Sequence, residues 1–312
     1  MINGNIDNEF IFDGILTVVK NNFSDSLTLM SKILVIVIIN SFLRTISENL
    51  GNESTSKIVS FVQYVIIATM ILDGFGDIIT LTQNTISDIV NFMKLLIPLL
   101  MTLMLTTGEF AFSNIVQPVI ILMINFIGEF IESIIIPLVM ISMSLSIISN
   151  FSKEITVDKL SKFIKKASIW ILGIMLTIFV GTISLEGTLG KSVDSLTSKT
   201  AKAVVADFIP VFGKILGDTA ETIIGCSKVL KNCVGIIGVI VIIGIVIVPV
   251  LKIAFLWISF KLTACFCEIV ADDKIVKLID QVSDCYQILL GILVAVSVML
   301  IIGITIVMSS VG

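Results

Sequence analysis

Residues 234–251 read VGIIGVIVIIGIVIVPVL and contain no charged side chain. A helix of about 20 apolar residues is long enough to cross the hydrocarbon core of a bilayer. A chain in lipid must satisfy its own backbone hydrogen bonds, and a helix does so within one segment. The stretch therefore predicts a transmembrane α-helix, and it guides the interpretation of the rest of the chain.

Similar stretches recur on both sides of it. The six that predict membrane helices without help are 27–43, 110–128, 133–152, 167–185, 234–251 and 285–312. Lys32 is the one charge within them, and it lies near enough to a helix end to reach the headgroups. Three weaker stretches, short or interrupted by charge, are 58–72, 95–108 and 253–270. The pattern predicts an all-α, polytopic integral membrane protein.

The composition agrees with this class and excludes others. Hydrophobic residues make up 56% of the 312 residues and charged residues 14%, against about 25% charged in an ordinary globular protein. The net charge of −4 offers no basic face for nucleic acid. Histidine is absent, which removes the commonest general base and zinc ligand. We therefore expect no enzyme activity, no metal and no cofactor.

The five cysteines form no metal-binding spacing. They lie in or beside apolar stretches, so we expect reduced thiols that pack as small apolar side chains. A disulfide on an oxidising face is the alternative.

Charge also predicts orientation. The segment 153–166 carries the densest basic cluster, Lys153, Lys159, Lys162, Lys165 and Lys166. Short lysine-rich segments stay cytoplasmic, whereas 73–93 carries three acids and no basic residue, so we place it on the opposite side. The first 26 residues are too acidic for a secretory signal, and they predict a short amphipathic helix on the membrane surface.

Four of the five prolines form two matched pairs. Pro98 and Pro137 are 39 residues apart, and so are Pro210 and Pro249. A charged amphipathic stretch follows each pair, beginning at Asp158-Lys159 and at Asp273-Lys274. The spacing predicts a duplicated unit with helices broken by these prolines, as in duplicated transporters. Chance recurrence in an apolar chain is the alternative, and the direction of the repeat, parallel or inverted, stays open.

The repeat divides the chain into five parts. They are an amphipathic segment (1–26), N-terminal transmembrane helices (27–89), a first repeat unit (90–187), a connecting segment (188–201) and a second repeat unit (202–312).

Acidic residues in apolar surroundings are the candidate functional groups. Glu109 closes one apolar run, and Glu129 and Glu132 interrupt another at a spacing that places them on one helix face. Charges at membrane depth usually face a water-filled cavity or a partner, so the three acids could line a polar path. The alternative is that they mark helix ends at the headgroups, and we favour that interpretation. No phosphate-binding loop or activated serine motif occurs.

The second half carries a family resemblance. Residues 181–187 read GTISLEG, and further short motifs follow in order: KTAK at 199–202, FIPVFG at 208–213, Gly225-Cys226, and LKN at 230–232 before Val234-Gly235. Upstream lie Phe92-Met93, Pro98, Gln117-Pro118 and Ile136-Pro137-Leu138. This order resembles the stage III sporulation protein AE family over residues 27–312, most specifically over 181–253.

The resemblance implies a role in endospore formation. It implies a multi-pass protein of the mother-cell membrane that faces the forespore. There the protein would be a non-enzymatic subunit of a secretion-like channel that joins the two cells. The expected partners are the lipid bilayer and other channel subunits, in a homo- or hetero-oligomer. The alternatives are a self-contained secondary transporter with duplicated halves and a membrane scaffold that conducts nothing.

Overall fold

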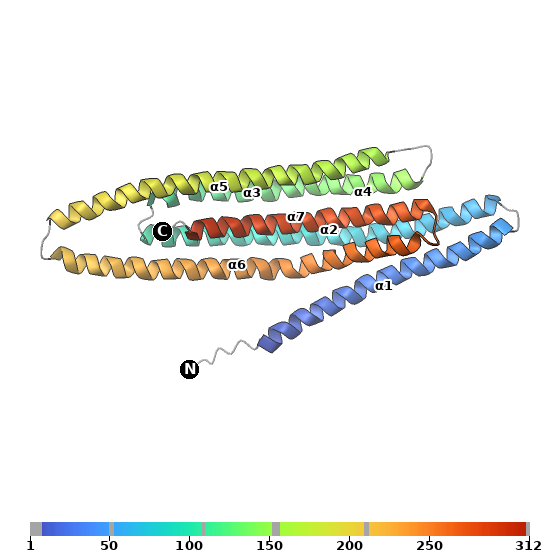
Figure 1. Cartoon of the computed structure of the whole chain (residues 1–312), viewed down its shortest axis with the longest axis horizontal. Coiled ribbons are helices and arrows are strands. Elements are labelled where there is room, and N and C mark those ends of the chain that lie inside the picture. Colours follow the sequence, from blue (N-terminus) through green and yellow to red (C-terminus); the bar gives the residue numbers. More distant parts are fainter. Residues whose placement is uncertain (1–7, 50–52, 108–109, 152–156, 209–211, 310–312) are drawn as a thin grey trace. The chain divides into compact units, whose positions relative to one another are not determined.

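The computed structural model describes residues 8–49, 53–107, 110–151, 157–208 and 212–309, and these residues form long helices with short connections (Figure 1). The elements are α1 (Asn8–Asn49), α2 (Glu53–Thr106), α3 (Phe110–Phe130), the π-helical turn η1 (Ile131–Ile135), α4 (Ile136–Phe151), α5 (Asp158–Phe208), α6 (Phe212–Cys267) and α7 (Asp273–Ser309). The described ranges contain no strand. The predicted all-helical class is confirmed.

Six helical stretches among the described residues are long and apolar enough to cross a membrane. They are Phe23–Leu43, Ile58–Thr106, Gln117–Ser149, Asp158–Ile183, Gly225–Cys267 and Asp273–Met308. Several are far longer than one crossing requires. The 54 residues of α2 extend about 80 Å at 1.5 Å per residue, against a hydrocarbon core of about 30 Å.

Two predicted spans join into one helical rod. We expected separate helices over 110–128 and 133–152, but α3, η1 and α4 follow one another without a connecting loop. The charges at Glu129 and Glu132 interrupt the apolar run, but a helix tolerates both residues. The intervening sequence also lacks the cluster of Gly, Pro, Asn, Asp and Ser that a turn requires.

Residues 73–93, which we placed outside the membrane segments, lie inside α2. The buried apolar residues of this stretch include Phe75, Ile79, Ile86, Ile89 and Met93. They recur at three, four or seven residues, which is the spacing of one helix face. This periodicity explains why the helix continues through aspartates and glycines that favour turns.

The prolines have different surroundings. Pro98 and Pro249 lie inside α2 and α6, which continue across them. Pro137 lies in the first turn of α4, directly after η1. A proline ring removes one backbone donor and crowds the carbonyl four residues earlier, and the wider π turn provides the space that this ring needs. Pro210 lies outside the described residues.

The chain forms two compact units, and the long helices contribute residues to both. The first unit, residues 1–83, 134–170 and 247–293, is built around Tyr286 of α7, which is fully buried. The ring of Tyr286 packs against Phe75 of α2 and Phe260 of α6, with centroid distances of 5.7 and 5.2 Å. The Tyr64 hydroxyl of α2 donates a hydrogen bond to the backbone oxygen of Ile147 in α4.

The second unit consists of residues 84–133, 171–246 and 294–312. Its helices approach closely at glycines. A Cβ atom at Gly238 of α6 would lie 2.5 Å from Leu96 of α2, and one at Gly303 of α7 would lie 3.3 Å from the Phe179 ring of α5. Small residues allow such approaches between helices in lipid, where packing drives association.

Candidate functional site

The charged groups of the first unit form a network between α5, α6 and α7. Its cations are Lys162, Lys165 and Lys261, and its anions are Asp158, Asp280 and Asp284. Gln281 connects them through both its side chain and its backbone oxygen. Three positive and three negative side chains give the network no net charge.

Lys165 is the buried cation of this network, with 6% of its surface exposed. Its Nζ donates to the backbone oxygen of Gln281 at 2.7 Å and lies 3.6 Å from an Asp284 carboxylate oxygen. A buried ammonium requires such partners, because its charge has lost most of its water. Lys165 therefore joins α5 to α7.

Asp158 begins α5, where a carboxylate is favoured by the helix dipole. Gln281 Nε2 donates to one of its oxygens at 2.6 Å, and Lys162, one turn later, donates to the other at 2.8 Å. Lys261 connects α6 to α7: its Nζ lies 2.5 Å from an Asp280 carboxylate oxygen and 3.9 Å from one of Asp284. Asp284 is therefore shared between the lysines of α5 and α6.

Three buried serines fasten α4 to the same part of α5. The Ser161 hydroxyl lies 3.1 Å from that of Ser142 and 2.8 Å from that of Ser146, and it donates to the Ser142 backbone oxygen at 2.9 Å. All three side chains are essentially inaccessible. Hydroxyls of this kind join helices in a medium that offers no water.

The level of the network in the membrane follows from the neighbouring sequence. Lys166 directly precedes the charge-free stretch 167–185, and Asp284 directly precedes the charge-free run 285–312. The sequence therefore predicts that the network lies at the edge of the hydrocarbon layer. The ion pairs and hydrogen bonds of the network join α5, α6 and α7 at this level.

The structure describes two of the three acids of the predicted polar path. Glu129 is exposed and Glu132 is partly exposed, and the latter lies in the π-helical turn η1. Glu109 lies outside the described residues. Neither Glu129 nor Glu132 forms an ion pair or hydrogen bond with a residue of the described ranges. The polar path stays a prediction.

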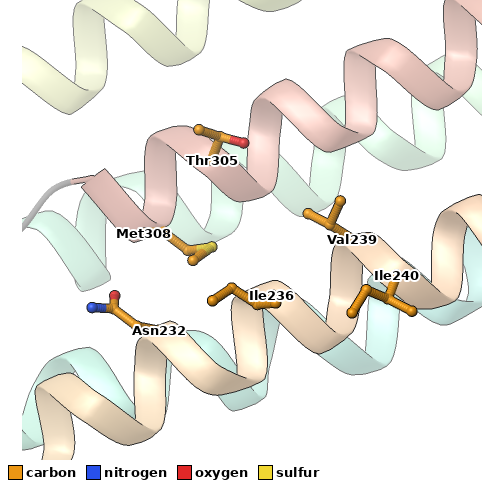
Figure 2. A pocket seen from close by; sticks show the side chains of 6 residues that line it. All are labelled: Asn232, Ile236, Val239, Ile240, Thr305 and Met308. Carbon is orange, nitrogen blue, oxygen red and sulfur yellow. The ribbon is translucent and has the colours of Figure 1, made fainter.

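An open apolar pocket of about 500 Å³ lies between α6 and α7 in the second unit (Figure 2). Ile236, Val239 and Ile240 line it from α6, and Thr305 and Met308 line it from α7. Asn232 stands at the end nearest Met308 (Figure 2). Nearby, the buried Lys231 points its Nζ to the Val307 backbone oxygen at 3.5 Å. The lining fits an acyl chain or an apolar side chain.

Among the described residues, no group of three or more Cys, Asp or Glu side chains is placed to hold a metal ion. All five cysteines are free thiols. Sequence reasoning missed the network that joins Lys165, Gln281 and Asp284, because no local spacing connects residues more than 100 positions apart. The available signal was the pair of charged stretches that begin at Asp158 and Asp273.

Long apolar helices, buried polar side chains that join neighbouring helices, and long charge-free runs define a polytopic α-helical membrane protein. Within that class, the chain belongs to the Stage III sporulation protein AE family, whose profile matches residues 1–311. The resemblance seen in the sequence is thereby confirmed.

One relative illustrates the membership. Stage III sporulation protein AE of Bacillus subtilis (strain 168) is 29% identical over 282 residues, which cover 90% of this chain and 71% of that protein. No solved structure matches the chain. The family and the helices together indicate a multi-pass membrane protein of sporulation.

Proposed function

We propose that the chain is a non-enzymatic membrane subunit of a channel or secretion-like complex that links mother cell and forespore during endospore formation. The family match over residues 1–311 carries this proposal. The chain would reside in the mother-cell membrane that faces the forespore. It would act there in an oligomer with itself or with other subunits.

The surface supports a role among lipids and neighbouring subunits. Large apolar side chains stand exposed on α1, α5 and α6, including Phe42 at 67%, Trp170 at 74% and Ile240 at 61%. Such side chains are stable only against acyl chains or other helices. The charged groups of the network are engaged with one another, which favours a structural or conducting role over catalysis.

The first experiment deletes the gene in the bacterium that encodes this chain and follows a late forespore reporter through sporulation. Loss of late expression, restored by the wild-type gene, is the expected result. Normal late expression in the deletion strain would contradict the proposal.

A flux experiment separates the channel subunit from a transporter. The purified chain in proteoliposomes is expected to pass no small solute on its own, and flux should appear only with further subunits of the complex. Solute uptake by the chain alone would instead establish a self-contained transporter.

The polar path has its own test. We expect Glu109→Gln, Glu129→Gln and Glu132→Gln together to block sporulation at a normal protein level if these acids line a conducting path. The matched control neutralises three other acids: Asp25→Asn, Asp73→Asn and Glu268→Gln, all exposed in the structure. Intact sporulation in the first triple variant would favour acids that only mark helix ends.

A further inference from the structure

The first turns of α5 have an unusual distribution of side chains. Their buried face consists of Ser161, Lys165 and Ser168, which form the contacts described above. Their outer face carries Phe163 and Trp170, which are 68% and 74% exposed. Ser161, Lys165 and Ser168 thus point inward, and two large aromatic side chains stand on the outer face, where a helix of a water-soluble protein usually carries only polar groups.

The outer face has a regular composition. Lys159, Phe163, Lys166 and Trp170 are all exposed and fall within an arc of about 60° at 3.6 residues per turn. We name these four residues the basic–aromatic stripe. It lies opposite the buried serines and Lys165, so it faces away from the contacts with α4 and α7.

The stripe lies where the chain enters the membrane. The charge-free stretch starts at residue 167, which places Trp170 about 5 Å inside it and Lys159 about 12 Å outside it along the helix axis. Tryptophan is enriched at this boundary because its ring is apolar and its N–H is polar. The headgroup layer is therefore level with the lysines of the stripe.

The lysines are available for a ligand. Lys159 and Lys166 form no ion pair with a residue in the described ranges. Lys162, beside the stripe, binds Asp158, but that pair is solvent-exposed (62% and 37%) and contributes little. Three exposed ammonium groups within three helical turns complement an anionic surface.

We propose that the basic–aromatic stripe, with Lys162, binds the headgroups of anionic phospholipids. The ammonium groups meet lipid phosphates, and the Phe163 and Trp170 rings rest on the upper acyl chains. Each lysine near an anionic surface favours binding about fivefold. This inference depends on the membrane helices alone and does not rest on the proposed sporulation channel.

The experiment uses Trp170 as its own reporter. The chain has two tryptophans, so Trp257→Phe leaves Trp170 as the single one. The full-length variant is reconstituted in vesicles of equal phosphatidylglycerol and phosphatidylcholine, with either lipid brominated high on its acyl chains. We expect brominated phosphatidylglycerol to quench Trp170 several-fold more effectively than brominated phosphatidylcholine. If Trp257→Phe does not fold, the difference between wild type and Trp170→Phe gives the same quantity.

Two comparisons complete the test. The preference should vanish in Lys159→Gln/Lys162→Gln/Lys166→Gln and weaken at about 1 M salt, where the Debye length is about 3 Å. It should persist in Lys32→Gln/Lys94→Gln/Lys228→Gln, which removes three exposed lysines from other helices. Equal quenching by both lipids in the parent, an unchanged preference in the first triple variant, or an equal loss in the control would each overturn the proposal.

Discussion

Lys165 shows how one residue decides the contact between two helices. It is 6% exposed, and its ammonium group contacts the Gln281 backbone oxygen and the Asp284 carboxylate, both of α7. Its neighbour Lys166, about 100° further around the helix, is exposed. Two adjacent lysines therefore have different roles, one in packing and one at the surface.

Replacing Lys165 with methionine should destabilise the protein. The methionine fills the space but leaves the Gln281 oxygen without its donor and Asp284 with Lys261 alone, at 3.9 Å, and loss of a charged hydrogen bond costs about 1.5–3 kcal/mol. Thermal unfolding in neutral detergent should begin at a lower temperature. Lys166→Met is the matched control, with an expected change below about 0.5 kcal/mol. Equal unfolding temperatures for the two variants would argue against the network.

Gly238 is a second residue with a specific packing role. A Cβ atom there would lie 2.5 Å from Leu96 and 3.6 Å from Ile304, whereas Gly244 on the same helix has nothing within 4 Å. The valine variant Gly238→Val should therefore separate α6 from its neighbours and cost about 1–3 kcal/mol.

Gly244→Val makes the same chemical change in open space and should be neutral or stabilising, because glycine is a poor helix former. The measurement is the unfolding midpoint of both variants in the same detergent. A larger loss in Gly244→Val would contradict the packing of the second unit.

At the scale of elements, α4 and α5 depend on hydroxyl contacts. Ser161→Ala removes the hydroxyl that contacts both Ser142 and Ser146. Contacts of this type between membrane helices contribute about 0.6–1.7 kcal/mol. The free energy of unfolding of the variant in detergent should therefore fall by that amount. Ser144→Ala is the control, because its exposed hydroxyl binds only the Met140 oxygen of its own helix. A loss in Ser144→Ala as large as that in Ser161→Ala would contradict the contact.

The sequence predicted which segments are helical and apolar better than it predicted where helices end. Charge-free runs such as 167–185 identify membrane segments by composition alone. The helix α2 joins 58–72 to 95–108 through the apolar periodicity of 73–93. In the sequence, this periodicity is a weaker signal than the aspartates and glycines of the same stretch, which favour turns. The contacts of Lys165 and Ser161 depend on tertiary packing between distant segments, which no local pattern encodes.

The duplication remains a proposal at this scale. Asp158 and Asp273, which begin the two matched charged stretches, are also the first residues of α5 and α7. In the first unit α5 and α7 run in the same direction (Figure 1). Asp158 of α5 contacts Gln281 of α7, and Lys165, further along α5, contacts Gln281 and also Asp284, further along α7. If the repeat is real, its two halves are parallel.

For the whole molecule, the level of the bilayer follows from where charges stop. The network joins the early turns of α5 to the early turns of α7, so we expect the chain to enter both helices from one side of the membrane. The lysine-rich sequence 153–166 predicts that this side is cytoplasmic. We then expect the stretch 167–185 to cross the membrane and residue 188 to lie on the opposite side.

Single cysteines in a cysteine-free background test this topology. Val157→Cys and Ala271→Cys should react with a membrane-impermeant thiol reagent only when it reaches the cytoplasmic face, and Thr188→Cys only from the other face. Labelling of residues 157 and 271 from different sides would contradict the parallel arrangement of α5 and α7. Labelling of 157 and 188 from one side would show that 167–185 does not cross. If all three positions were labelled from the face opposite to the one expected, the crossing helices would stand and only the orientation assigned by the lysines would be refuted. Orientation depends on charge bias, whereas crossing depends on apolar length.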